Sequence, residues 1–211
     1  MTETIDLPAL ADLVQTRAAD GRVIVAMVGA PGSGKSTLAD RLAGKLNARQ
    51  PGLAAVLPMD GYHYDDTYLT PQGWQSRKGA PHTFDVGGLC HTLKRMRARD
   101  EAEVAVPVFD RQIEIARAGA RLIPASIPVI IVEGNYLLLN LDPWPRLRPM
   151  FDLTVMIDVP EGVLKSRLTA RWVRYGLTPP QIAAKLEEND LPNGRLIRSD
   201  SAPATYRIAN A

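Results

Sequence analysis

The stretch Val23-Ile24-Val25-Ala26-Met27-Val28-Gly29-Ala30-Pro31-Gly32-Ser33-Gly34-Lys35-Ser36 decides the fold of this chain of 211 residues. Its first six residues are continuously apolar, which is typical of a strand buried on both faces of a parallel sheet. Its last eight match the pattern G-x-x-x-x-G-K-[ST], in which glycines let backbone N–H groups curl around phosphate oxygens. Residues 36–48 then have the spacing of a helix, whose positive end favours an anion. Together these features predict a nucleotide-phosphate site.

Two residues of this phosphate loop have specific chemical roles in the prediction. Lys35 supplies a positive charge to the terminal phosphates of a nucleotide, and the Ser36 hydroxyl is placed to bind Mg²⁺. The residues that we expect to contact ATP in the loop are Gly29, Gly32, Ser33, Gly34, Lys35, Ser36 and Thr37. An ordinary glycine-rich turn is the alternative, and the strand and helix on either side argue against it.

Apolar stretches and segments with helical spacing alternate along the rest of the chain. We expect further strands at residues 53–59, 104–109, 121–123, 129–132, 153–159 and 206–208, and further helices at residues 7–17, 85–97, 161–175 and 178–189. The segment 61–84, rich in Gly, Pro, Tyr and His, is expected to be a long functional loop. This alternation predicts an α/β sandwich with a mainly parallel sheet, whose ligands bind beyond the carboxyl ends of the strands.

The composition is typical of a globular domain and excludes several classes of protein. Hydrophobic residues make up 45% and charged residues 23% of the chain, and the net charge of +2 is too small for a protein that coats nucleic acid. The one cysteine, Cys90, cannot form an internal disulfide, which fits a reducing compartment. The acidic start and the short apolar runs predict no signal peptide, no membrane span and a cytosolic location.

Two carboxylates stand at the ends of predicted strands. Asp60 follows the strand at residues 53–59, where it could take the proton of an acceptor hydroxyl that lies in line with the γ-phosphate. Glu133 ends the strand expected beside the first one, where it could bind Mg²⁺ directly or through water. The alternatives are a solvated loop residue for Asp60 and a helix or turn cap for Glu133.

Basic and aromatic residues gather in two further segments. The stretch Arg77-Lys78-Gly79-Ala80-Pro81-His82-Thr83-Phe84-Asp85 suits an anionic or polyhydroxylated acceptor. Asp85 alternatively fits the N-cap of the next helix, and His82 fits an exposed position. The segment Phe109-Asp110-Arg111 would either add to this pocket or form a simple ion pair. His63 is equally compatible with a substrate contact and with a structural role.

A basic helix is predicted after the strand at residues 153–159. Arg167, Arg171 and Arg174 recur at positions i, i+4 and i+7, so one helical face presents three guanidinium groups. A solvated face is one interpretation of this pattern. In a nucleotide enzyme, the other is a lid that clamps phosphates and neutralises the transferring charge, with Arg171 in a catalytic role.

Motifs that the sequence lacks argue against several nucleotide enzymes. It contains neither the Asn-Lys-x-Asp guanine motif of GTPases nor the Leu-Ser-Gly-Gly-Gln signature of transporter ATPases. It also lacks the Asp-Gly-Phe-Pro-Arg segment usual in nucleoside monophosphate kinases. A small-molecule kinase fits the length best, and a regulatory subunit that binds ATP without transferring phosphate is the alternative from another class.

From about residue 20 to about residue 200, the chain resembles the P-loop kinase superfamily of uridine kinase, phosphoribulokinase and bacterial type I pantothenate kinase. The resemblance rests on the phosphate loop, the Arg-rich helix from Lys165 and the segments Met59-Asp60-Gly61-Tyr62, Arg77-Lys78-Gly79-Ala80-Pro81, Val106-Pro107-Val108-Phe109 and Val132-Glu133-Gly134-Asn135. The whole is most similar to a fructokinase-like branch associated with fructose transport. The resemblance implies a three-layer α/β P-loop NTPase fold in one domain over residues 1–211. Within it, residues 1–20 would hold an N-terminal helix, and residues 161–190 a helical lid and the following helix.

The resemblance also assigns roles by position. Lys35 and Ser36 would bind phosphates and Mg²⁺, Asp60 would be the base and share the Mg²⁺ shell with Glu133, and Arg167 and Arg171 would act from the lid. Residues lining the acceptor pocket would be Tyr62, His63, Arg77, His82 and Asn135. The implied reaction transfers the γ-phosphate of ATP to a hydroxyl of a small molecule, foremost a sugar, with pantothenate or a nucleoside as alternative acceptors. A monomer or homodimer is expected.

Overall fold

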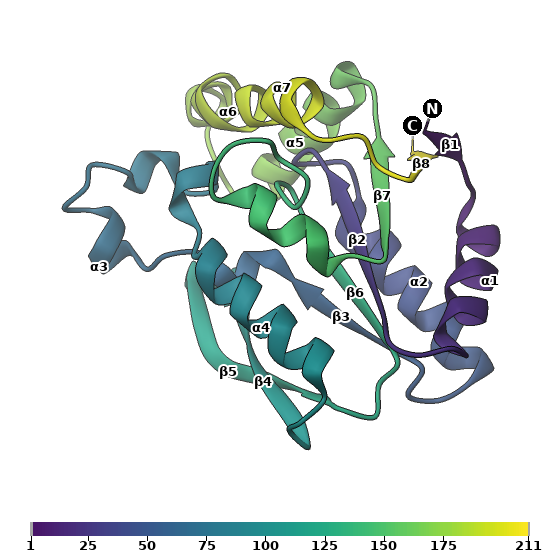
Figure 1. The fold of residues 1–211 in the computed structure, drawn as a ribbon. Coiled ribbons are helices and arrows are strands. Elements are labelled where there is room, and N and C mark those ends of the chain that lie inside the picture. The colour runs from purple at the N-terminus through teal and green to yellow at the C-terminus, as the bar shows by residue number, and fades with distance from the viewer. Residues whose placement is uncertain (1, 211) are drawn as a thin grey trace.

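The computed structural model describes residues 2–210 and contains the expected alternation of strands and helices (Figure 1). In chain order, its strands and α-helices are β1 (Glu3–Thr4), α1 (Leu7–Ala18), β2 (Val23–Gly29), α2 (Lys35–Arg49), β3 (Ala54–Pro58), α3 (Asp66–Leu69), α4 (Val86–Ala98), β4 (Glu103–Asp110), β5 (Ile115–Pro124), β6 (Val129–Gly134), β7 (Leu153–Asp158), α5 (Glu161–Arg174), α6 (Pro179–Lys185), α7 (Leu191–Asp200) and β8 (Tyr206–Ala209).

Six of the strands form one parallel sheet in the order β1-β8-β7-β2-β6-β3. Every residue of the central strands β2 and β6 is buried, because both faces of the sheet are covered. Val25 and Met27 pack on the side of α1, α2 and α5, whereas Ile24 and Ala26 pack on the side of α4. The predicted three-layer α/β fold with a mainly parallel sheet is therefore confirmed, and the carboxyl ends of β2, β3 and β6 meet at one edge.

Two predicted strands lie outside the main sheet. β4 and β5 pair only with each other, as an antiparallel hairpin with a bulge between Val106 and Val108. β5 is longer than the expected segment at residues 121–123, and most of its side chains are exposed. An exposed strand shows little apolar alternation, so its length could not be predicted from the hydrophobic pattern.

The long segment at residues 61–84 and the helix after it also differ in detail from the prediction. The segment contains the short helix α3 and several single 3₁₀ turns rather than a uniform loop. Asp85 is the N-cap of α4, where its side chain accepts a hydrogen bond of 2.8 Å from the Gly88 amide. This confirms the capping alternative for Asp85.

The C-terminal helical region continues beyond the predicted end at residue 189. A π-helical turn, Leu186–Asp190, connects α6 to α7, which runs on to Asp200. Pro192 and Gly194 have low helix propensity, so the sequence pattern did not predict this helix. Proline is nevertheless acceptable in the first turn of a helix. Single π turns within helices are frequent at functional sites.

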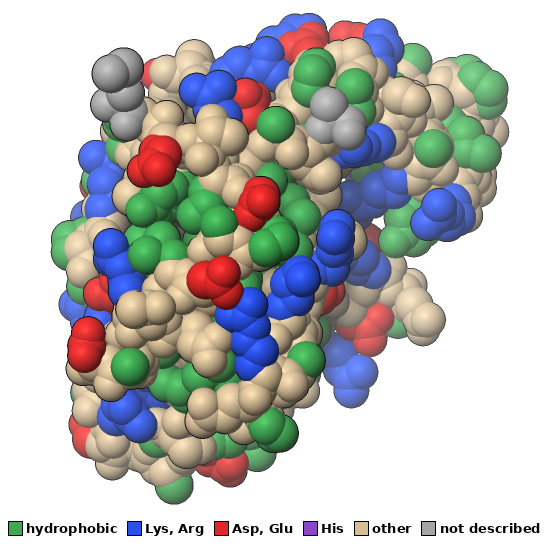
Figure 2. Space-filling view, turned by 90° about the vertical axis from the view of Figure 1, so that its right-hand side faces the viewer, with side chains coloured by type: hydrophobic (Ala, Val, Ile, Leu, Met, Phe, Trp, Pro, Cys, Tyr) green, Lys and Arg blue, Asp and Glu red, His purple; other side chains and the backbone are tan. Residues whose placement is uncertain are grey.

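Surface charge is unevenly distributed over the molecule. Figure 2 shows Lys and Arg side chains gathered around the hollow at the right of the view, with mixed charges over the rest of that face. The net charge of +2 thus includes a local concentration of cations. Within residues 2–210, no helix combines the length and the apolar character needed to cross a membrane.

Candidate active site

The phosphate loop forms the turn between β2 and α2. Gly32 and Gly34 have φ angles of 79° and 81°, in the left-handed region that favours glycine. Gly34 is the N-cap of α2 and makes no side-chain cap, so the first amides of the helix and its positive end stay open to an anion. Lys35 and Ser36 follow directly, with side chains that line the space in front of the loop.

A cavity of about 460 Å³ lies in front of this loop. The predicted site residues that line it are Gly32, Gly34, Lys35, Ser36, Thr37, Asp60, His63, Asn135 and Arg171. Asn135 adds a buried side-chain oxygen that has no hydrogen-bond partner among residues 2–210, so it is free to accept a bond from a ligand. We call this space the main cavity; it brings the phosphate loop, a strand-end carboxylate and a guanidinium of α5 together.

Asp60 lies in a 3₁₀ turn directly after β3, and its side chain is 21% exposed. It forms an ion pair with Arg111, which reaches it from the end of the β4–β5 hairpin. Burial by itself would raise the pKa of Asp60, but electrostatic interactions with His63, Arg111 and Lys35 and the hydrogen bond from Arg111 outweigh it and lower the pKa below its ordinary value. Asp60 is therefore ionised at neutral pH, as a proton acceptor must be.

Gly61 allows the hairpin to approach Asp60 so closely. A Cβ at this position would collide with the backbone carbonyl of Pro107 in β4. The absence of a side chain lets β4 pack directly on the turn, which carries Arg111 to the carboxylate.

Glu133 ends β6 and is 5% exposed. Ser36 Oγ donates a hydrogen bond of 3.1 Å to its Oε2 atom, which connects it to the phosphate loop. Burial raises the pKa of Glu133; the positive charge of Lys35 opposes this rise, and the negative charge of Asp60 adds to it. The two carboxyl groups therefore have pKa values shifted in opposite directions, which is a pattern of acid–base and metal sites.

The residues around Ser36 fit Mg²⁺ held mainly by phosphate and water. Residues 2–210 contain no group of three or more His, Cys, Asp or Glu side chains able to hold a metal ion. Ser36 and Glu133 are instead in direct contact, and the charge of Asp60 acts on Glu133. Because Mg²⁺ keeps several waters and takes few protein ligands, one hydroxyl with one or two carboxylates suits a nucleotide-bound ion.

Glu133→Gln should make the ligand-free protein more stable at pH 7, by about 0.5–2 kcal/mol. The folded chain holds the Glu133 proton to a higher pH than the unfolded chain, so stability falls as pH rises through the interval above 4.5. A neutral amide removes this cost, and the advantage should fade as pH falls towards 4.5. Thermal unfolding measured across this pH range checks it, with each kcal/mol worth about 2–4 °C.

The matched control for this stability prediction is Glu103→Gln. Glu103 is an exposed residue of β4, so its replacement should leave the unfolding temperature nearly unchanged at every pH. If Glu133→Gln lowered stability by the same amount at every pH, burial of charge would not be the dominant effect at this position.

Three predicted acceptor residues do not line the main cavity. Tyr62 is buried in the core on the side of α4, because the 3₁₀ turn directs it away from the main cavity, which His63 lines. Arg77 instead donates a hydrogen bond to the backbone carbonyl of Glu188 in the π turn. His82 is exposed and stacks edge-on against Trp74, with ring centroids 4.9 Å apart, in a separate cavity of about 280 Å³.

Three predicted nucleotide residues also lie outside the main cavity. Gly29 is the buried last residue of β2, and a Cβ there would collide with Ser33. The Ser33 side chain is buried and lines a separate cavity, and its amide donates to the carbonyl of Ala30 at 3.0 Å. Arg167, which precedes Arg171 by one helical turn on α5, does not reach the main cavity.

Besides the residues expected individually, the main cavity contains residues from the two segments proposed for the acceptor pocket, 77–85 and 109–111, and others that the sequence did not indicate. Arg111 is the most important, since it combines the two alternatives for its segment: it lines the cavity and forms an ion pair. Lys78 lies beside it, and its Nζ donates 2.6 Å hydrogen bonds to Asp66 and to the Glu114 carbonyl. Further lining residues are Pro31, Asp66, Gln75, Gly79, Phe84, Phe109, Glu114, Trp172, Lys185, Asn189, Asp190 and Asn193.

The π turn connects the helices α5 and α7 to the loop around Lys78. Trp172 Nε1 donates to Asp190 at 2.7 Å, and the guanidinium of Arg171 lies 5.1 Å from the Trp172 ring centroid. Asn189 Nδ2 donates to the Lys78 carbonyl at 3.2 Å. These contacts hold the α5 segment over the main cavity and orient Arg171.

Similar known proteins show the family of this chain, although no family model matches it. It is 34% identical to the uncharacterised Escherichia coli K12 protein YggC over 197 residues, which are 92% of this chain and 81% of that protein. It is 31% identical to a Schizosaccharomyces pombe protein named putative uridine kinase C227.14, over 82% of this chain and 76% of that protein. The chain belongs to the P-loop kinases of the uridine kinase type.

A solved structure supports the same family assignment. The protein from Silicibacter sp. TM1040 described as a putative fructose transport system kinase is 40% identical to this chain and superposes with a TM-score of 0.88. The match covers 96% of this chain and 98% of that one. The P-loop kinase resemblance predicted from the motifs is therefore confirmed over nearly the whole chain. Kinases of this type use ATP, usually with Mg²⁺.

Proposed function

We propose that this protein transfers the γ-phosphate of ATP to a hydroxyl group of a small, polyhydroxylated molecule, with a sugar as the first candidate. The observation that carries the proposal is that the phosphate loop, Asp60 and Arg171 line one cavity. The proposed acceptor side adds the free Asn135 oxygen and the charged and amide groups of Gln75, Lys78 and the π turn. Such a mixed polar lining suits several hydroxyl groups better than an apolar ligand.

The proposed mechanism uses positioning and charge. The acceptor oxygen forms a bond to the γ-phosphorus while the bond from that phosphorus to the bridging oxygen of ADP breaks, and Asp60 takes the hydroxyl proton. Lys35 and Arg171 offset the negative charge on the transferred group. Ser36 and Glu133 would hold Mg²⁺, which neutralises phosphate charge when bound. Arg111 helps to keep Asp60 ionised. The Asp60 carboxylate would then contact both Arg111 and the hydroxyl of an approaching acceptor.

Arg171→Ala should lower kcat by roughly 10- to 10³-fold, because a guanidinium at the transferring phosphate acts mainly in the transition state. The matched control is Arg174→Ala, since Arg174 is exposed on the same helix and is not among the residues that line the main cavity. Its kcat should stay within about 2-fold of the original. Steady-state kinetics of both variants checks this, and equal losses would remove Arg171 from the charge-stabilising role.

A product assay over a panel of acceptors tests the proposed function. The protein is incubated with ATP, Mg²⁺ and, separately, fructose and other sugars, uridine and other nucleosides, pantothenate, glycerate and nucleoside monophosphates. Formation of ADP together with one phosphorylated acceptor supports the kinase and identifies its substrate. Tight ATP binding without any phosphorylated product would favour a regulatory ATP-binding protein instead.

A further inference from the structure

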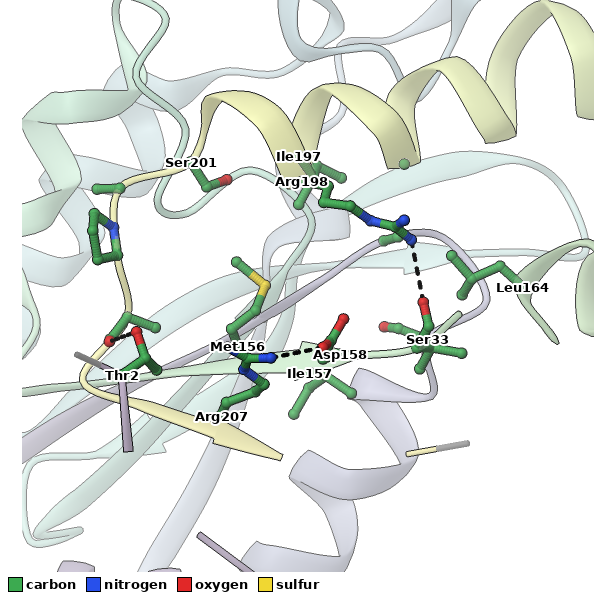
Figure 3. A pocket seen from close by; sticks show the side chains of 16 residues that line it. Thr2, Ser33, Met156, Ile157, Asp158, Leu164, Ile197, Arg198, Ser201 and Arg207 are labelled. Atoms are coloured by element: carbon green, nitrogen blue, oxygen red, sulfur yellow. Dashed lines mark hydrogen bonds and ion pairs between the residues drawn. The ribbon is translucent and has the colours of Figure 1, made fainter. Parts of the chain in front are cut away.

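A second cavity, of about 380 Å³, lies behind the phosphate loop, between α7 and the strands β7 and β8 (Figure 3). Among residues 2–210, no residue lines both this cavity and the main cavity. Both cavities nevertheless touch the same loop: Ala30 and Ser33 line this rear cavity, whereas Pro31 and Gly32 line the main one. A ligand in the rear cavity would thus contact the phosphate loop on the side opposite to the main cavity.

Two buried hydroxyl groups in the rear cavity lack partners. Ser33 is 1% exposed, and neither its Oγ nor the buried Oγ of Ser201 has a hydrogen-bond partner among residues 2–210. These side chains come from the phosphate loop and from the end of α7, far apart in the sequence, and both border the same space (Figure 3). Buried hydroxyls are nearly always hydrogen-bonded, so two orphans in one cavity indicate a polar ligand.

Two guanidinium groups border the rear cavity from opposite sides. Arg198 comes from α7 and Arg207 from β8 (Figure 3). Arg198 donates to the Val159 carbonyl at 3.3 Å, and Arg207 donates to Asp158 at 3.2 Å. A guanidinium has five N–H donors, so each retains donors for a ligand. With Asp158 as the one acidic residue among the described lining residues, the border carries a net positive charge.

The remaining lining determines the size and kind of ligand. Met156, Leu164 and Ile197 supply apolar surface. The volume lies at the lower end of the range for small-molecule sites, which is about 300–1,000 Å³. Guanidinium groups bind carboxylates and phosphates in a planar, often bidentate geometry. The cavity therefore matches a compact anion that also carries hydroxyl groups.

We propose that the rear cavity is a second ligand site, which binds a small hydroxylated organic anion between Arg198 and Arg207, with its hydroxyl groups on Ser33 and Ser201. This ligand acts on the nucleotide site through the loop. The Ser33 carbonyl accepts a 2.7 Å hydrogen bond from Asn210, and its amide donates to Ala30. Occupation of Ser33 Oγ favours one loop geometry and so changes the affinity for ATP, by about 5-fold or more.

Calorimetric binding to the full chain tests this proposal, with ribose 5-phosphate and gluconate as the phosphorylated and carboxylated probes. The double variant Arg198→Ala/Arg207→Ala and the single variant Ser201→Ala remove rear-cavity contacts, and Lys35→Ala weakens the phosphate loop. At least one probe should bind, and the double arginine variant should weaken its binding by about 10-fold or more. Lys35→Ala should leave that binding nearly unchanged, and Ser201→Ala should weaken it by a smaller factor.

The coupling to ATP separates a second site from simple competition. With rising probe concentration, the Kd for ATP should shift to a plateau, and the double arginine variant should lose this shift while it binds ATP normally. The proposal is overturned if the probes bind the double variant as well as the original protein but fail to bind Lys35→Ala. It is also overturned if neither probe binds at millimolar concentration, or if the Kd for ATP rises without a plateau.

Discussion

Asp60→Asn should lower kcat by roughly 10²- to 10⁴-fold, the range expected when a positioned general base is lost. The amide keeps the size of the carboxylate but cannot take the acceptor proton. Asp60 lies in the turn after β3 and not in the phosphate loop, so we expect the Kd for ATP to change little. Single-turnover phosphate transfer, with ATP binding measured in parallel, separates these two effects.

The matched control for the base is Asp110→Asn. Asp110 lies at the end of β4, pairs with Arg117 and is not among the residues that line the main cavity. The Asp110→Asn variant should retain near-normal turnover, since the substitution removes a carboxylate near Arg111 and leaves Asp60 unchanged. Near-normal turnover of Asp60→Asn itself would remove Asp60 from the base role.

Lys35→Ala should lower kcat/KM for ATP by roughly 10²- to 10³-fold, as expected when one preorganised charge at the reacting phosphate is lost. Lys35 is the first residue of α2 and lines the main cavity, and its charge also acts on Asp60 and Glu133. The loss therefore removes the phosphate contact and alters both carboxylates. Steady-state kinetics with ATP as the varied substrate measures it.

Lys45→Ala is the control for the phosphate-loop lysine. Lys45 is exposed on the same helix, two to three turns away, so its removal should change kcat/KM by less than about 2-fold. If Lys35→Ala had kinetics as little changed as those of Lys45→Ala, the loop would not hold the transferred phosphate.

The position and shape of the phosphate loop could be predicted because its signals are local. The strand at residues 23–28, the glycine pattern and the helix after it are adjacent in the chain. The placement of Asp60 and Glu133 at one edge of the sheet could be predicted because the carboxyl ends of parallel strands meet there, and β3 and β6 are neighbours in the sheet. Sequence periodicity suffices for such regular elements.

The proposed acceptor side of the main cavity could not be predicted in detail because its geometry depends on packing between distant segments. Tyr62 and His63 are adjacent, yet one enters the core and the other faces the main cavity, since a 3₁₀ turn orients each side chain by its neighbours. Arg111 reaches Asp60 only because an exposed hairpin packs against Gly61. The signal for Arg111 was its place directly after a strand, but sequence alone could not distinguish a pocket residue from an ion pair.

The π turn at Leu186–Asp190 was also beyond sequence analysis. It shifts the helical register by one residue, which brings Asn189 and Asp190 into the main cavity. A regular helix through this region would orient these two side chains differently. The local sequence has no pattern that predicts such a turn. The contacts of the turn with Trp172 and Lys78 come from tertiary packing.

The central claim is that the phosphate loop and Asp60 face one another across the space that an acceptor hydroxyl occupies. A crystal structure with a non-hydrolysable ATP analogue and Mg²⁺ tests it most directly. We expect the terminal phosphate to lie on Lys35 and the loop amides, with the Asp60 carboxylate directed at it across a gap that admits one hydroxyl group. A terminal phosphate bound elsewhere, or an Asp60 side chain turned away from it, would contradict the account.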